Sequence, residues 1–456
     1  MRTGSSSRRG TLVAASLGFV VVLLDVSVVN VALDALLREF RTDVAGLQWV
    51  VNAYTLVFAA LLLSSGALGD RFGPRRIYLG GLALFTVASV ACGAAPGLGT
   101  LVAARLLQGV GAALLVPNSL LMLQRAFADP AERSRAIGWW GAIGGIAMAA
   151  GPVLGGVLVA HGGWRSIFLI NLPIGLLAGA LTMRHVPADG PGHARRLDGP
   201  GQLAAVLALA ALTATLVEAG RLGWTSAWVA GGLLLALAAG GAFVWIEARS
   251  AAPMLPLGLL RIRAFAIASL CGVVVNFGYY GLVFVFSLFF QVQQHLSPQR
   301  TGLAFLPMTL VLMGASVLAG RLVTRIGARR LMVMGLGLAA CGYALLLPVR
   351  IEGAYAWLIV PMLLAASGTA LCVPTMTNLA LSSVEASRAG IASGVLNAAR
   401  QVGGLLGVAV FGHLVRHTAP QAFLRGMQLS AGIAAVLLLL GCALCWWRLA
   451  PLPRGR

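Results

Sequence analysis

The chain consists of long runs of apolar residues that follow one another along almost its whole length. Hydrophobic residues occupy 59% of its 456 positions, charged residues occupy only 10%, and the mean hydropathy is +0.91. Soluble domains carry roughly 25% charged residues, and they leave much of their surface in water. A lipid bilayer is therefore the solvent that suits this chain, because a helix needs about 20 apolar residues to cross its hydrocarbon core.

We predict fourteen spanning helices, each long enough to cross the hydrocarbon core. An even number places both termini on one side of the membrane. The arginines concentrate in the loops on that side, which predicts cytoplasmic termini. The expected spans are residues 11–36, 45–69, 77–95, 98–125, 135–160, 165–186, 199–218, 226–247, 265–290, 299–323, 330–349, 354–380, 389–415 and 425–447.

A segment rich in proline, glycine and charge, PADGPGHARRLDGP, follows the sixth expected span. It predicts a cytoplasmic linker at residues 187–198. The linker would separate an N-terminal six-helix bundle, residues 1–186, from two inserted membrane helices, residues 199–250. A C-terminal six-helix bundle would then occupy residues 251–456.

The charge of the chain excludes several functions. The net charge is +20, but the basic residues lie in short gaps between apolar runs, so we expect no nucleic-acid partner. All 33 basic residues are arginine, and an ATP-binding P-loop or a pyridoxal Schiff base needs a lysine.

The six cysteines lie within apolar runs, which favours packing over disulfides or metal binding. We find no catalytic residue set, so we expect no enzyme, no metal and no cofactor.

An internal repeat links two loops far apart in the sequence. Residues 66–76 read GALGDRFGPRR and residues 320–330 read GRLVTRIGARR, with Gly, Arg, Gly, Arg and Arg matching at constant spacing. The first copy follows the second expected helix and the other follows the tenth, so two helices are inserted between the repeated units. Parallel repeats are typical of secondary transporters whose substrate site lies between the halves. The alternative is a generic basic hairpin that only sets topology.

Five motifs in sequence order resemble those of the major facilitator superfamily, in particular its fourteen-helix branch of drug:proton antiporters. Residues 66–76 match the loop motif GxLxDRxGxRR, residues 105–111 match RxxQGxG, and residues 151–156 match GPxxGG. Residues 24–33 resemble LDxTVVNVALP, and residues 164–175 match WRxIFxINxPxG. The resemblance covers nearly the whole chain. It implies an all-α membrane protein with the major facilitator fold, in which two pseudo-symmetric six-helix bundles enclose the transport route.

Three positions depart from the motifs of this branch. Ser27 replaces a threonine and keeps its hydroxyl group. Asp34 stands where the signature has proline, so we expect a less kinked outer end of the first helix. Thr324 replaces an acid in the second loop motif, so that copy is expected to lack a carboxylate lock.

Asp25 and Arg105 are the charged residues that we expect to couple transport to protons. Asp25 lies about 14 residues, or roughly 21 Å, into the first helix, and Arg105 lies about 10 Å from the outer end of the fourth. Both therefore sit in the outer half of the membrane, where ionisable residues face the bundle interior and find partners. The resemblance supports proton carriage by Asp25. The alternative is a fixed ion pair that only orients helices.

Two groups of residues are predicted to form gates. The resemblance implies that Asp70, with Arg71 and Arg75, takes part in a charge network that closes the cytoplasmic side. Gly151 and Pro152 suit a hinge or seal between the halves, because glycine permits close approach and proline kinks a helix. Arg400 is a second buried cation and a further gate candidate. The alternatives are a helix-end topology signal and plain tight packing.

Polar and aromatic residues at mid-depth are candidates for the substrate cavity, although such side chains more often join helices. The candidates are Asn30, Gln108, Asn118, Asn276, Tyr279, Tyr280, Asn378 and Asn397.

The sequence thus predicts a monomeric, multi-pass transporter of the cell inner membrane. It would export small amphipathic organic compounds, such as drugs or antibiotics, in exchange for protons. The proton gradient alone would drive this exchange. Its partners would be small-molecule substrates, protons and membrane lipid. One alternative is a dedicated exporter of one natural product or lipid-like precursor, and another is a non-transporting membrane sensor or scaffold.

Overall fold

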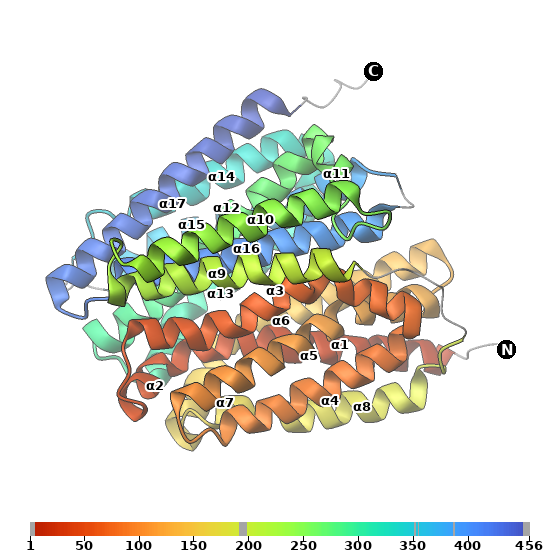
Figure 1. Cartoon of the computed structure of the whole chain (residues 1–456), viewed down its shortest axis with the longest axis horizontal. Helices are drawn as coiled ribbons and strands as arrows, with labels where there is room; N and C mark the ends of the chain where they lie inside the picture. Colours follow the sequence, from red (N-terminus) through yellow and green to blue (C-terminus); the bar gives the residue numbers. More distant parts are fainter. Residues whose placement is uncertain (1–4, 191–197, 351–352, 354, 386–387, 450–456) are drawn as a thin grey trace.

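The computed structural model describes residues 5–190, 198–350, 353, 355–385 and 388–449. Within these ranges every regular element is a helix. The long helices run nearly side by side (Figure 1), and α1 begins and α17 ends towards the right of that view. We call this end the termini side. The other end, where α2 and α7 lie, is called the opposite side.

The first half of the chain forms one bundle of six long helical segments, some of them broken into shorter pieces. Its elements are α1 (Ser5–Val28), the 3-10 turn η1 (Val29–Ala32), α2 (Leu33–Glu39), α3 (Val44–Phe72), α4 (Pro74–Gly93), α5 (Leu98–Ala126), α6 (Pro130–Gly162), α7 (Ser166–Leu169) and α8 (Asn171–His185).

An inserted helical hairpin and a second bundle follow. The hairpin, α9 (Gly199–Leu222) and α10 (Ala227–Arg249), packs through α9 on α3 and α16. The second bundle consists of α11 (Gly258–Arg261), α12 (Arg263–Leu288), the π-helical turn η2 (Phe289–Gln293), α13 (Pro298–Ile326), α14 (Ala328–Ala344), α15 (Ala356–Ser382), α16 (Ala389–Leu414) and α17 (Pro420–Arg448). Most of the predicted linker, residues 191–197, lies outside the described residues.

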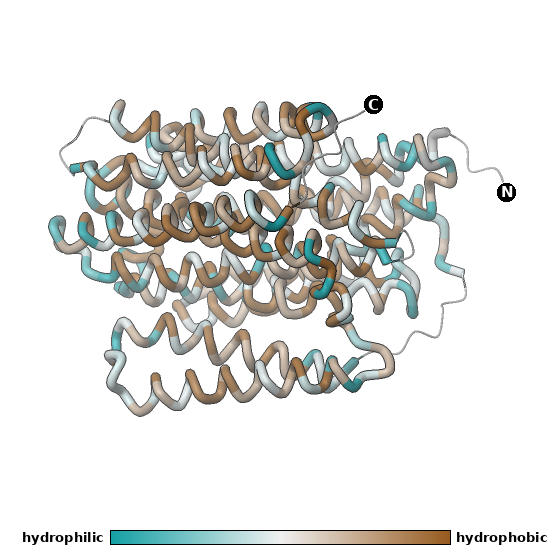
Figure 2. Tube along the Cα trace, turned by 90° about the horizontal axis from the view of Figure 1, so that it is seen from above, coloured by the Kyte–Doolittle hydropathy of each residue, from teal (hydrophilic) through white to brown (hydrophobic). Residues whose placement is uncertain are grey.

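Among the described residues, 13 helical segments are long and apolar enough to cross a membrane. Figure 2 shows hydrophobic residues along the helices and hydrophilic residues gathered towards their ends. The helix expected at 330–349 is present as α14, but it has 17 residues and is shorter than all 13 of these segments. The protein is therefore a multi-pass protein of the cell membrane.

The first expected helix is present, but it contains a short 3-10 turn; the less kinked outer end stays a prediction. The α-helix ends at Val28 and continues as α2 only after the 3-10 turn. The side-chain amide of Asn30 donates to the carbonyl of Val26, while the carbonyl of Asn30 accepts from Ser287 and Gln291 of the other half. These contacts occur at the break, although Asp34 replaces the proline of the motif.

The two copies of the repeated loop have the same backbone form. Gly73 ends α3 with φ of 96° and Gly327 ends α13 with φ of 84°. Side chains rarely adopt this conformation, so both positions favour glycine. The next helix of each half begins immediately afterwards, at Pro74 or Ala328. The match in sequence thus corresponds to a match in local structure.

Candidate functional site

A fully buried ion pair lies inside the first bundle. Asp25 of α1 and Arg105 of α5 are paired, and almost none of either side chain is exposed. The other carboxylate oxygen of Asp25 accepts from the side-chain amides of Gln108 at 2.8 Å and Asn171 at 3.2 Å. Four helices, α1, α4, α5 and α8, meet at this cluster, because Ser89 of α4 accepts from both amides.

The partners of Asp25 are themselves held in place. Arg105 donates from Nε to the carbonyl of Val50 at 3.0 Å, and its guanidinium lies 4.4 Å from the centre of the Tyr54 ring. Ser89 donates its hydroxyl proton to the carbonyl of Phe168 at 2.9 Å, so its lone pairs face the two amides. The cluster is thereby locked by backbone carbonyls on two sides.

The local sequence explains how these side chains converge. Arg105 and Gln108 are three residues apart on α5 and therefore share a helix face. Gly109 and Gly111 bring α5 against its neighbours, because a Cβ atom at either position would lie 2.6 Å from backbone atoms of Tyr54 or Phe85. Asn171 is the first residue of α8, directly after the break at Ile170.

The hydrogen-bond partners of the Asp25 carboxylate are all donors. They come from Arg105, Gln108 and Asn171. Asn171 Oδ1 is buried and has no hydrogen-bond partner within the described ranges. A rotated Asn171 amide would therefore offer an acceptor to a protonated Asp25. The motif containing Asn171 was visible in the sequence, but its place beside Asp25 was not, and Ser89 carried no signal.

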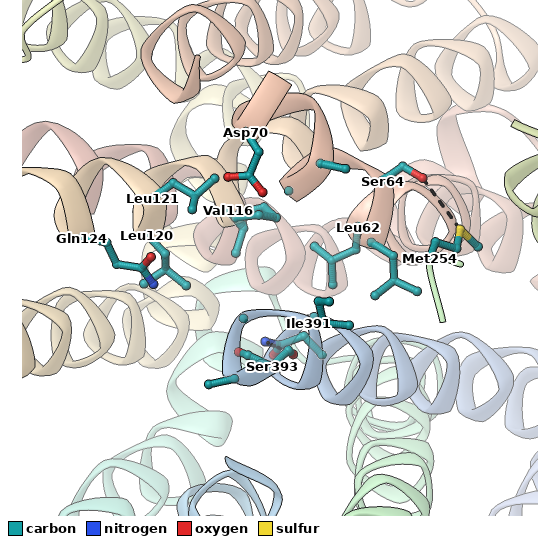
Figure 3. Close-up of a pocket in the computed structure, with 18 of the residues that line it drawn as sticks. Leu62, Ser64, Asp70, Val116, Leu120, Leu121, Gln124, Met254, Ile391 and Ser393 are labelled. Atoms are coloured by element: carbon teal, nitrogen blue, oxygen red, sulfur yellow. Dashed lines mark hydrogen bonds between the residues drawn. The ribbon is translucent and has the colours of Figure 1, made fainter. Parts of the chain in front are cut away.

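A cavity of about 630 Å³ lies between the two halves near the termini side. Figure 3 shows its wall, in which Asp70 and Gln124 come from the first half and Ser393 comes from the second. Most of the lining is apolar, with leucines from α3 and α5. Asp198 and Met254, which flank the inserted hairpin, also reach the cavity.

The predicted substrate residues are distributed more widely than expected. Asn397 lines this cavity, whereas the other seven are not among the residues that form its wall. Gln108 belongs to the Asp25 cluster, Asn118 donates to Ser65, and Asn30 joins the halves through its carbonyl.

The remaining candidates lie in the second half. Asn276 donates to the carbonyl of Gly272 one turn earlier in α12, and the rings of Tyr279 and Tyr280 meet edge to face with centres 5.3 Å apart. Asn378 is exposed on α15. A role in substrate binding stays a prediction for all eight residues.

The first loop motif, which was predicted to form a gate, contacts a carboxylate that the sequence analysis did not single out. Asp189, which is buried, accepts from the backbone amides of Arg75 at 3.2 Å and Arg76 at 2.9 Å, at the start of α4. It also pairs with Arg125 at 3.6 Å. Carboxylates stabilise helix N-termini in this way. Arg71 instead lies over the ring of Phe72, with 5.1 Å to its centre.

On the opposite side, the backbones of the two halves approach each other closely. A Cβ atom on Gly156 of α6 would lie 2.6 Å from the carbonyl of Pro298, and one on Gly302 of α13 would lie 2.3 Å from the carbonyl of Pro152. Pro152 lies at this contact between the halves, whereas Gly151 packs on Ser27 within the first bundle. Gln48 adds hydrogen bonds from α3 to α16 carbonyls at 2.7 and 2.9 Å.

The fold and the site define a multi-pass membrane transporter, with a buried charge cluster in one bundle and a cavity between two related bundles. A sequence model described as Major Facilitator Superfamily matches residues 15–408. The chain belongs to this superfamily, whose members are transporters and not enzymes.

Relatives with curated names agree with this assignment. The multidrug resistance protein Stp of Mycobacterium tuberculosis is 40% identical over 89% of this chain and 75% of its own length. The methylenomycin A resistance protein of Streptomyces coelicolor is 36% identical over 98% of this chain and 93% of its own length. The crystal structure of a D-xylose-proton symporter has the same fold, with a TM-score of 0.71, 15% identity and coverage of 97% and 98%.

Proposed function

We propose that this protein is a proton-coupled antiporter that exports small amphipathic organic compounds by alternating access. The observation that carries the proposal is the buried Asp25–Arg105 pair, held by donors inside the bundle that forms one wall of the cavity. An ionisable residue at this depth costs energy and is retained for function. The names of the relatives, which include multidrug and methylenomycin A resistance, support drug or antibiotic export.

The topology of the proposal has fourteen spans. With 17 residues, α14 is about 25 Å long and reaches the lower limit for crossing the hydrocarbon core, so we count it as the remaining span. The two bundles, residues 1–186 and 251–456, then flank the linker at 187–198 and the inserted hairpin at 199–250. Since α1 begins and α17 ends on one side, both termini are cytoplasmic by the distribution of arginines.

This orientation makes the structure an inward-open state. The cavity is then on the cytoplasmic side, and the Gly156 and Gly302 contacts seal the outside. When the seal opens, a proton from the outside binds Asp25 and neutralises it, which releases Arg105 from the pair. Return to the inward-open state restores the donors around Asp25, and the proton leaves to the cytoplasm.

Gate residues would control which side is open. Asp70 lines the cavity, and Arg75 follows it at the start of α4, where its backbone amide donates to Asp189. The transporter would act as a monomer in the inner membrane, without a cofactor, because the proton gradient supplies the energy. Export of one dedicated natural product is the narrower version of the proposal.

Inverted membrane vesicles with an imposed pH gradient test the proposal. Addition of methylenomycin A, puromycin or another candidate should dissipate the gradient, as reported by a pH-sensitive dye, in the wild type. Asp25→Asn should abolish the response, while Glu39→Gln, which removes an exposed acid paired with Arg165, should preserve it. Equal responses of wild type and Asp25→Asn would refute proton carriage by Asp25 and favour a non-coupled role.

A further inference from the structure

Arg400 is a cation inside the second bundle that no carboxylate of the described residues neutralises. It lies near the middle of α16, and it donates from a guanidinium nitrogen to the side-chain amide oxygen of Asn397 at 3.3 Å. Its Nε atom is buried and has no hydrogen-bond partner in the described part of the chain. Arg105, the buried cation of the first bundle, is paired with Asp25. The first bundle therefore holds a paired buried cation, whereas the second holds a cation that no carboxylate of the described residues neutralises.

The surrounding helices make room for this side chain. A Cβ atom on Gly272 of α12 would lie 3.1 Å from Cγ of Arg400, so the glycine accommodates the stem of the arginine. Gly403, on the next turn, would place a Cβ atom 2.2 Å from the carbonyl of Val273, which shows how closely α12 and α16 approach. This close packing encloses the stem of Arg400 between α12 and α16.

The cavity comes within one side chain of this arginine. Asn397 lines the cavity wall and accepts from Arg400 at 3.3 Å, whereas Arg400 itself is not among the residues that form the wall. The Arg400 side chain is only partly buried. A guanidinium group has five donors in a planar fork, which fits a carboxylate or sulfonate better than any neutral group.

We propose that Arg400 and Asn397 form a subsite for the anionic or acidic end of exported amphipathic compounds. This inference rests on the proposed export function and specifies its substrate class. The apolar walls of α3 and α5 would hold the rest of the molecule. Arg400 is then a substrate-binding residue in addition to any role in gating.

A matched pair of fluorescent probes tests the subsite without a proton gradient. Anilinonaphthalene sulfonate carries an anionic group, and N-phenylnaphthylamine has the same ring framework without it. Both are titrated into the full chain in lipid nanodiscs, with empty nanodiscs subtracted. Arg400→Gln should weaken binding of the anionic probe by roughly tenfold to a hundredfold and leave the neutral probe unchanged, because a charge-assisted hydrogen bond is lost.

Control variants separate a subsite from a structural role. Arg400→Lys keeps the charge but not the fork, so it should retain the preference for the anionic probe at reduced affinity. Arg425→Gln removes an exposed arginine of α17 and should bind both probes like the wild type. The subsite is refuted if Arg400→Gln weakens binding of both probes equally, or of neither. If Arg400→Gln fails to fold, the Arg400→Lys variant decides, and loss of its preference for the anionic probe refutes the subsite. Transport by Asp25→Asn is measured separately, so failure of proton coupling remains distinguishable.

Discussion

Replacement of Gly302 by valine should shift the protein away from the state seen here. A Cβ atom at this position would lie 2.3 Å from the carbonyl of Pro152, whereas an ordinary contact begins at 3.4 Å. The helices α6 and α13 must therefore separate by about 1.1 Å, the difference between these distances. Overpacking of this kind costs about 1–3 kcal/mol. A cost of about 2 kcal/mol, felt only when the opposite side is closed, changes the population ratio roughly 30-fold.

Spin labels on the opposite side measure this shift. His161→Cys near the end of α6 and Arg300→Cys near the start of α13 are exposed positions on the two halves. In a background without the native cysteines, Gly302→Val should increase the population of long distances between the labels. Gly314→Val on the same helix is the matched control, because a Cβ atom there meets nothing within 4 Å. An unchanged distance distribution in Gly302→Val would refute the reasoning that this contact seals the opposite side.

Three further predictions concern the charge cluster, the first loop motif and the inserted hairpin. Asn171→Leu removes the donor to Asp25 and Ser89, so the thermal midpoint should fall, at a cost of about 1–3 kcal/mol for the buried acceptors left with one donor fewer. Asn378→Leu, at an exposed position of α15, should leave the midpoint in place, and equal midpoints for the two variants would show that the Asn171 amide does not stabilise the cluster. Gly73→Ala should lower the thermal midpoint, at a cost of about 1–2 kcal/mol, because φ is 96° and the new Cβ atom would lie 2.2 Å from the Asp189 side chain. Gly80→Ala has open space around the new Cβ atom and should leave the midpoint unchanged. Equal midpoints for the two variants would contradict this account. Glu218→Gln weakens the contacts of this side chain with Trp49 and Arg221, so protease cleavage of the α9–α10 loop should become faster. The increase should be no more than severalfold, because the ion pair is partly exposed. An unchanged cleavage rate would show that these contacts do not anchor the hairpin.

The membrane class and most helices could be predicted from the sequence, because each span must satisfy its own backbone hydrogen bonds within lipid. The repeat in the sequence corresponds to a shared loop structure, which the structure showed through the positive φ of both Gly73 and Gly327. The interruptions at Val29–Ala32 and at Ile170 were not predicted. They coincide with contacts to distant segments, which local periodicity does not reveal.

The charge pair was predicted by depth, whereas its environment was not. Asp25 and Arg105 are ionisable residues in apolar helices, so the cost of burying each charge alone already requires a partner. The participation of Ser89 and Asn171 depends on how α4 and α8 rotate against α1. Likewise, the contact of Asp189 with the first loop motif joins positions more than a hundred residues apart.

By itself, the sequence determined that this chain spans a lipid bilayer and that it contains two related halves. It also determined that the interior holds a few charged residues whose burial costs free energy. Hydropathy, spacing and composition are sufficient for those conclusions because lipid imposes the same requirement on every helix. Only the tertiary structure decided which charges are neutralised, which glycines let the two halves approach closely, and which residues line the cavity. Those properties depend on the rotation and approach of helices far apart in sequence, at distances where a single Cβ atom or a single hydrogen-bond donor changes the outcome.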